Sequence, residues 1–174
     1  MSEKRVREME LLVREVQPGD EEAIVAILNP IIETGRYSVL DAPVTVEAEG
    51  EFIVGFPARG VFHIAEDCRR NKAVGFQTLE PFATYTHAFD HVAIISTAVD
   101  LSSRRHGVGT RLAEVTLDKA KQKGYEKVFT YVRADNDSAL KFYRSLGFRV
   151  VGTAERHAKF GRSYVDEIIV EKFL

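Results

Sequence analysis

At 174 residues, 45% of them hydrophobic, the chain is long enough for one compact domain with a proper core, whereas two full domains would each be small and weakly cored. The formal net charge of −2, with Lys and Arg scattered along the chain, excludes the concentrated basic face that nucleic-acid binding requires. There is no apolar run of the ~20 residues that span a bilayer and no signal-peptide core, and Cys68 is the single cysteine, so we expect a cytoplasmic protein without disulfides or a metal site.

The N-terminal third predicts a strand followed by two helices. Residues 1–10 are interpreted as a polar lead-in, and the domain is expected to span residues 11–174. Residues 11–16 predict the strand, and the acids of residues 20–22 favour the start of a helix, where the helix dipole stabilises negative charge. Apolar residues at spacings of three and four continue this helix to Ile32, with a kink or interruption expected at Asn29-Pro30.

The rest of the chain alternates between strand-like and helical patterns, which favours a mixed α/β domain. After a loop at residues 35–38, a second helix is expected over residues 44–56, and the aromatic segment 81–90 is expected to be irregular. Residues 91–99 form a nearly continuous apolar run, which indicates a central strand buried on both faces. The remaining predicted strands are residues 61–66, 73–79, 128–132, 149–156 and 164–173, and the remaining helices are 107–123 and 136–146.

The segment from Val99 to Thr110 joins the central strand directly to an amphipathic helix. Glycines at 107 and 109 would let the backbone approach a ligand, and unpaired amides of the first helical turn would point at it. Arg104 and Arg105 add positive charge, so the pattern is typical of a diphosphate site. The alternative is an ordinary turn in which the glycines only relieve steric crowding.

Two other nucleotide-binding patterns do not fit this segment. A dinucleotide-binding fingerprint needs a third glycine, but Leu112 stands in its place. A Walker-type phosphate loop needs a G-K-[ST] sequence, which the chain lacks. Neither a dinucleotide nor a nucleoside triphosphate is therefore predicted as the ligand.

A second motif runs from Asn136 to Phe148. Asn136 and Tyr143 are seven residues apart, so they lie on about one face of a helix, two turns from each other. The alternative to a role in binding or catalysis is structural: Asn136 would cap the helix and Tyr143 would pack in the core.

Together the two segments resemble the GNAT superfamily of acyl-CoA N-acyltransferases. Arg104-x-x-Gly107-x-Gly109 is similar to the pyrophosphate loop of that superfamily, and the motif from Asn136 to Phe148 is similar to its second CoA motif. Residues 27–34, 43–45, 96–99 and 161–166 extend the likeness to the phosphinothricin acetyltransferase branch. The resemblance implies a single α/β (α+β) domain with a mixed central sheet of about seven strands, splayed between the fourth and fifth, and about four helices.

The resemblance also implies an acetyl-CoA-dependent N-acetyltransferase that uses acetyl-CoA as co-substrate and no metal. Backbone amides near Ala98 and Val99 would polarise the thioester carbonyl, and Asn136 would bind the pantetheine arm. Tyr143 would serve as general acid for the leaving thiolate and would contact the cofactor as well. The implied pyrophosphate residues are Arg104, Arg105, His106, Gly107, Val108, Gly109 and Thr110.

The general base and the acceptor are less constrained by the sequence. The branch places a glutamate on the strand before the pyrophosphate loop, and the alignment puts Ile95 there, so Glu33, Glu80, His91 or a water chain would have to act instead. The expected acceptor is the primary amine of a small amino-acid-like molecule. The expected substrate-contacting residues are Glu33, Arg36, Tyr37, Tyr85 and His91, and the alternative for them is ordinary surface packing.

Three functions stay open at this point: a small-amine acetyltransferase, a protein N-terminal or lysine acetyltransferase, and a non-catalytic acyl-CoA-binding module. A homodimer is expected from the family resemblance, and nucleic acid and membranes are not expected as partners.

Overall fold

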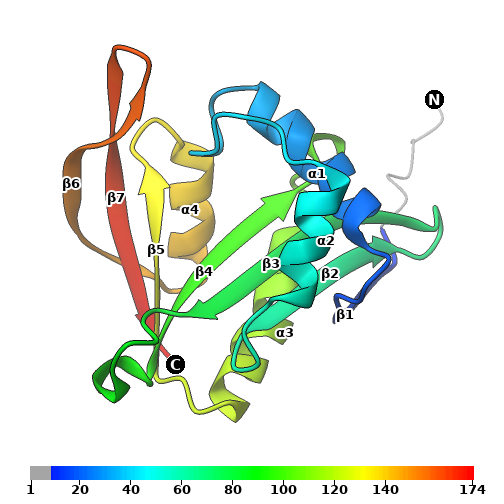
Figure 1. Ribbon diagram of the computed structural model, residues 1–174, viewed down its shortest axis with the longest axis horizontal. Helices are drawn as coiled ribbons and strands as arrows, with labels where there is room; N and C mark the ends of the chain where they lie inside the picture. Colours follow the sequence, from blue (N-terminus) through cyan, green and yellow to red (C-terminus); the bar gives the residue numbers. More distant parts are fainter. Residues whose placement is uncertain (1–8) are drawn as a thin grey trace, which may run out of the picture.

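The computed structural model describes residues 9–174, and the greater part of the expected lead-in, residues 1–8, lies outside it. One seven-stranded mixed sheet has the order β1-β2-β3-β4-β5-β7-β6 (Figure 1). The strands are β1 (Leu11–Glu15), β2 (Val61–Asp67), β3 (Lys72–Pro81), β4 (Val92–Val99), β5 (Lys127–Arg133), β6 (Arg149–Phe160) and β7 (Ser163–Phe173). The helices are α1 (Glu21–Glu33), α2 (Val46–Val54), α3 (Val108–Gln122) and α4 (Asp137–Ser145), with short 3₁₀ turns η1 (His87–Phe89) and η2 (Leu101–Ser103).

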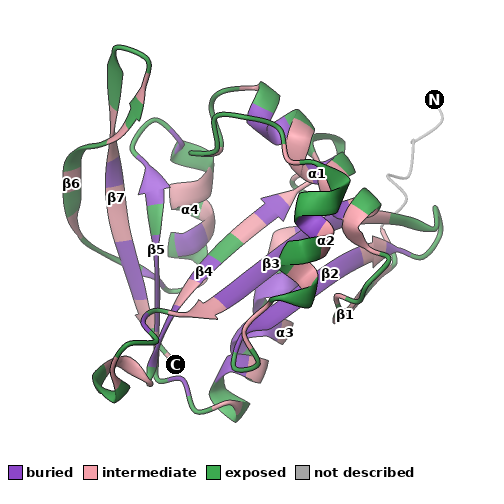
Figure 2. Cartoon of the chain, viewed as in Figure 1, coloured by how far each residue is buried: buried purple, intermediate pink, exposed green. Residues whose placement is uncertain are grey.

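The helices cover the sheet from both faces, because each brings an apolar stripe that must be buried. Helix α1 packs with Phe62, Ile64 and Phe76 of β2 and β3, and α2 lies beside it. Helices α3 and α4 cover the opposite face, where Leu79, Ile95 and other apolar residues of the sheet form the largest core cluster. Figure 2 shows the buried central strands between these two layers.

Among residues 9–174 the one parallel strand pairing, between β4 and β5, is short. The two strands are in register only at Val92–Lys127, Ala93–Val128 and Ile94–Phe129. Beyond Ile94 they diverge, whereas β4 stays paired with β3 as far as Val99. Figure 1 shows the two arrows separating toward their carboxyl ends. The expected splay between the fourth and fifth strands is therefore confirmed, together with the seven strands and four helices.

The main departure from the predicted elements is at Pro30. Helix α1 is not interrupted there but continues to Glu33. Pro30 lies in the last turn of the helix, so it removes one hydrogen bond to the carbonyl four residues earlier, and only a short segment of helix follows it. The preceding Asn29 exchanges two hydrogen bonds with the backbone of Val44, which ties α1 to the loop before α2.

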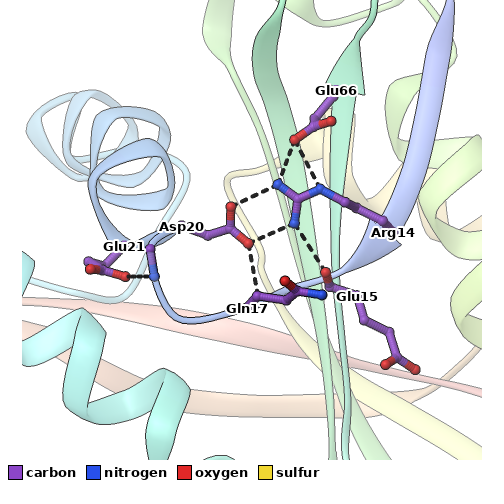
Figure 3. Close-up of polar contacts among 7 residues, drawn as sticks. Arg14, Glu15, Gln17, Asp20, Glu21 and Glu66 are labelled. Carbon is purple, nitrogen blue, oxygen red and sulfur yellow. Dashed lines mark hydrogen bonds and ion pairs between the residues drawn. The ribbon is translucent and has the colours of Figure 1, made fainter.

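A charged cluster fastens β1 to β2 and to the start of α1 (Figure 3). The guanidinium of Arg14 donates to both carboxylate oxygens of Asp20, at 2.7 and 2.8 Å, and to Glu66 Oε1 at 2.6 Å. Asp20 also accepts from the backbone N–H of Gln17, which shapes the turn before α1. The hydrogen bonds from Arg14 hold the pKa of the Asp20 carboxyl below its usual range.

Replacing Asp20 by asparagine should lower the free energy of unfolding by about 1–2 kcal/mol at pH 7, since charge-assisted bonds of a partly exposed pair are lost. The folded pKa of Asp20 is depressed, so its contribution is present above the unfolded pKa of about 3.9 and is lost as pH falls through the lower folded value. Urea denaturation over a falling pH series should show the wild-type advantage shrinking. Asp41→Asn, at an exposed loop carboxylate, is the control, and a difference independent of pH would contradict the ionic origin.

No helix within residues 9–174 is both long enough and apolar enough to cross a membrane.

Candidate active site

The splay leaves backbone groups of β4 without a strand partner. Val92 O accepts from Phe82 N on the β3 side, and His91 O accepts from Lys127 N on the β5 side. Because successive residues direct their backbone groups to alternate sides, those of Ile95, Thr97 and Val99 face the opening between β4 and β5. The backbone groups of Ala98 face β3 instead. Of the two expected amide donors, Val99 therefore lies on the open side.

The open end of the splay is next to the N-terminus of α3. Gly107 caps the helix with a φ of 80°, and no side chain in the described part of the chain caps it. The first helical bond runs from Arg111 N to Gly107 O, so the amides of Val108, Gly109 and Thr110 have no partner within the helix. These amides and the dipole of a 15-residue helix favour an anionic ligand. Arg105 and His106, just before the helix, are exposed.

Glycine is favoured at positions 107 and 109 for two different structural reasons. A side chain at Gly107 would meet nothing within 4 Å, but the left-handed φ favours glycine there. A Cβ at Gly109 would lie 3.0 Å from Cε2 and 3.2 Å from Cζ of Phe142 on α4. Gly109 therefore allows α3 and α4 to pack closely, which brings the two sequence motifs together. Val108 is only 1% exposed, so its side chain is part of the core and only its backbone can serve a ligand.

The loop between α1 and α2 lies against the open end of the splay. The guanidinium of Arg104 is 4.0 Å from the centroid of the Tyr37 ring, and its Nε donates to Val99 O at 3.4 Å. Arg133, at the end of β5, donates to Ser38 O and forms a bidentate pair with Asp135. Sequence reasoning missed Arg133, because a charged residue at the end of a strand resembles any surface position.

Asn136 caps α4. Its Oδ1 accepts from Ala139 N at 3.1 Å and from Ser138 Oγ at 2.9 Å. Because these bonds occupy the oxygen, the side-chain Nδ2 group is the part of Asn136 that could meet a ligand.

Tyr143 projects from α4 toward the splay. Its ring packs against Phe142 and Phe148, and only 6% of the residue is exposed. The hydroxyl hydrogen-bonds to Thr97 Oγ1 of β4 at 3.1 Å. Burial raises the pKa of Tyr143 to about 12, and the hydroxyls of Thr97 and Thr130 oppose that rise. Thr130 belongs to β5, so the phenol oxygen lies between the two diverging strands.

Ile95, the residue that the alignment places at the position of the branch's glutamate, lies in the core. It is 1% exposed and packs in the core on the face covered by α3 and α4. The neighbouring Ile94 faces the α1 side, and its register partner on β3 is Glu80. Ile94 is also the last residue paired with β5, so Glu80 lies at the point where the splay begins. A carboxylate at position 95 of this chain would be buried in the core, so this position does not offer a base.

Burial raises the pKa of the Glu80 carboxyl, which is half-buried. Glu33, at the end of α1, and His91, before β4, are both exposed. Of the three residues expected to replace the missing glutamate as base, Glu80 is the one that is not exposed.

The expected substrate residues divide between two ends of β4. Arg36 and Tyr37 belong to the loop at the open end, and Arg36 is close enough to affect the pKa of Asp135. His91 lies eight residues before Val99, about 26 Å along an extended strand. Tyr85 lies in the loop at that far end and is 81% exposed. The structure does not bring these two groups together.

Within residues 9–174, no three His, Cys, Asp or Glu side chains gather in an arrangement that could hold a metal ion.

Comparison with known proteins gives the same family for the chain as the sequence motifs indicated. The model of the acetyltransferase (GNAT) family matches residues 29–148. YwnH of Bacillus subtilis, named as a candidate phosphinothricin acetyltransferase, is 28% identical over 140 residues, which cover 79% of this chain and 83% of YwnH. A mycothiol acetyltransferase of Corynebacterium aurimucosum is 39% identical over 89 residues, 51% of this chain. The match spans only 28% of that enzyme's length.

Among solved structures, a phosphinothricin acetyltransferase of Sinorhizobium meliloti in complex with acetyl-CoA superposes with a TM-score of 0.86. The match covers 95% of this chain and 89% of that one at 16% identity, so it shows a shared fold.

Proposed function

The chain belongs to the acetyltransferase (GNAT) family of acetyl-CoA-dependent N-acetyltransferases, and from that membership we propose that it acetylates the primary amine of a small amino-acid-like molecule by direct attack. Tyr143 is the general acid. The observation that carries this assignment is the hydroxyl of Tyr143, held between the diverging strands and bonded to Thr97 at 3.1 Å.

The splay and the start of α3 have the chemistry that acetyl-CoA requires. The free amides of Val108, Gly109 and Thr110, the left-handed Gly107 and the adjacent Arg104, Arg105 and His106 suit a diphosphate. The backbone groups of Thr97 and the amide of Val99, which have no strand partner, suit the amide-containing pantetheine arm and the thioester carbonyl, whereas the backbone of Ala98 is directed to β3. Asn136 Nδ2 is available to pantetheine from the other side. These residues fit the co-substrate.

The two faces of the sheet separate the acid from the base. Tyr143 and Thr97 lie on the face of α3 and α4, and Glu80 lies on the face of α1. A neutral amine attacks the thioester carbonyl from the Glu80 side, and Glu80 takes up the proton that the amine loses. The carbon–sulfur bond then breaks, and the leaving thiolate receives a proton from Tyr143 on the opposite side. The resulting phenolate is reprotonated from solvent, so no covalent acyl-enzyme forms.

The open end of the site favours a small acceptor with a negative group. Arg36 is exposed there. Arg104 and Arg133 instead hold the loop through the Tyr37 ring and Ser38 O, and Asp135 already occupies the guanidinium of Arg133. Guanidinium groups recognise carboxylates and phosphinates by paired hydrogen bonds. The name of YwnH supports the same class, since phosphinothricin is an amino acid.

The direct test is release of free CoA from acetyl-CoA, followed with a thiol reagent, in the presence of amino acids, phosphinothricin analogues, polyamines and peptides. Rapid release with amino-acid-like amines supports the proposal. Turnover confined to peptides would assign a protein acetyltransferase instead. Binding of acetyl-CoA without turnover of any acceptor would favour a non-catalytic module.

Replacing Glu80 by glutamine should lower kcat/KM for the amine by about 100-fold, the usual loss on removal of a general base. In the wild type kcat/KM should rise with pH through a limb above the ordinary glutamate value of about 4.3, because burial raises the pKa of Glu80. That limb should vanish in the variant.

Glu49→Gln is the matched control, since Glu49 of α2 is also a buried carboxyl whose pKa burial raises. A loss in Glu49→Gln without one in Glu80→Gln would move the base to α2.

Three further expectations belong to the same proposal. Residues 11–174 form the catalytic domain. The protein is located in the cytoplasm, where the lone Cys68 would stay reduced. It is a homodimer. Sedimentation of the purified chain tests the last of these.

A further inference from the structure

Gln77 is a polar residue enclosed in the sheet. It lies in the middle of β3 with 0% exposure, and Thr97 is its register partner on β4. Its Nε2 donates to Thr97 Oγ1 at 2.8 Å, while its Oε1 has no hydrogen-bond partner among the described residues. The side chains on either side of Gln77 and Thr97 on the same face, Leu79 and Ile95, are apolar core residues.

Such a position is unfavourable for stability. A buried amide that leaves one of its polar atoms unpaired lowers the free energy of unfolding relative to an apolar residue of similar shape. The fold alone would therefore accept methionine or leucine at this position. The one interaction that distinguishes glutamine there is its bond to the threonine that contacts Tyr143.

The protons available permit donation to run from Gln77 through Thr97 to Tyr143, and either hydroxyl of the Thr97–Tyr143 pair can be the donor. An amide nitrogen can only donate, so Thr97 Oγ1 accepts from Gln77 and its own single proton remains available. Tyr143 Oη is 3.1 Å away and can accept that proton. When Tyr143 accepts from Thr97, its own proton is left for Thr130, the other hydroxyl at the phenol oxygen, or for a leaving group in the splay.

We infer that Gln77 and Thr97 are positioning residues that orient the hydroxyl proton of Tyr143 toward the leaving sulfur. The chain of donation runs from Gln77 on β3 through Thr97 on β4 to Tyr143 on α4. This inference rests on the proposed role of Tyr143 as general acid, and it adds two residues that do not themselves touch the reacting atoms.

Steady-state kinetics of Thr97 variants test this series of hydrogen bonds. Thr97→Val, which keeps the shape and removes the hydroxyl, should lower kcat about tenfold and leave KM for acetyl-CoA within about twofold, since orientation and not binding is lost. Thr97→Ser keeps the hydroxyl and should retain most of kcat. Equal losses in both variants would overturn the inference.

Gln77→Met separates positioning from stability. We expect an unchanged or higher melting temperature together with a several-fold lower kcat, because the unpaired amide oxygen is removed with the donor. A lower melting temperature with unchanged kcat would show a structural role only.

The direction of the pKa change at position 143 tests which of the two hydroxyls donates the hydrogen bond. A fluorinated tyrosine incorporated at position 143, which titrates within the stable pH range, can be followed by ¹⁹F NMR. If Thr97 donates to the phenol oxygen, Thr97→Val should raise the pKa of this residue, because a donor to the phenolate is lost. A lowered pKa would mean that the tyrosine donates to Thr97, which would overturn the inference.

A double variant distinguishes this inference from the proposed function. Thr97→Val in a Tyr143→Phe background should cost no further activity. If Tyr143→Phe alone has full activity, the general-acid assignment fails. If Tyr143→Phe is impaired and Thr97→Val lowers kcat tenfold more in that background, only the positioning chain fails.

Discussion

Replacing Tyr143 with phenylalanine should lower kcat by about 100-fold or more, with KM for acetyl-CoA changed little. The ring keeps its packing against Phe142 and Phe148, so the change removes only the hydroxyl that faces the splay. Without it the thiolate must leave unprotonated or wait for solvent, and a positioned general acid typically contributes 10²–10⁴-fold. Initial rates of CoA release at saturating amine measure the effect.

The pH profile provides a second check on the same residue. Burial raises the pKa of Tyr143 to about 12, so the group stays protonated throughout the neutral and mildly alkaline range. The wild type should therefore show no alkaline loss of kcat from Tyr143 below about pH 10. Thermal unfolding of the variant should differ by no more than about 1 kcal/mol, the net worth of one hydrogen bond. Full activity of a well-folded Tyr143→Phe protein would exclude the general-acid role.

Replacing Gly109 with alanine should lower the free energy of unfolding by up to about 2 kcal/mol. Alanine is the better helix former by about 1 kcal/mol, but the new Cβ would lie 3.0 Å from the Phe142 ring, and overpacking costs typically 1–3 kcal/mol. Phe142 precedes Tyr143 on α4, so moving its ring also displaces the proposed general acid. We expect kcat/KM for acetyl-CoA to fall about tenfold, measured beside chemical denaturation.

Phe142→Leu is the matched background for this test, because it removes the ring edge that Gly109 faces. In that background Gly109→Ala should become neutral or stabilising, as helix propensity alone then decides the sign. An unchanged penalty would show that Phe142 is not the cause. Gly109 would then be required for a ligand or for the backbone.

Much of the site could be predicted from the sequence, because local patterns carry it. A glycine that must adopt a positive φ at the start of a helix and an asparagine at an N-cap are both fixed by their immediate neighbours. The order of strands and helices followed from apolar periodicity for the same reason. Pro30 departed from its local rule, since its cost depends on how near the helix end lies.

The residues that the sequence did not identify act across strands. Whether Ile94 or Ile95 packs in the core under α3 and α4 depends on which face of β4 each residue occupies, and a shift by one position exchanges the two faces. Gln77 meets Thr97 only because β3 and β4 pair in one register, and Arg133 reaches Ser38 only because the end of β5 meets the loop before α2.

By itself, then, the sequence determined the elements, their order and the two segments that resemble the CoA motifs of the family, because each depends on residues close in the chain. The tertiary structure alone decided which polar side chains surround Tyr143, on which face Glu80 lies and why Gly109 must be small. Those contacts join residues on different strands and helices, and register and packing between elements set them.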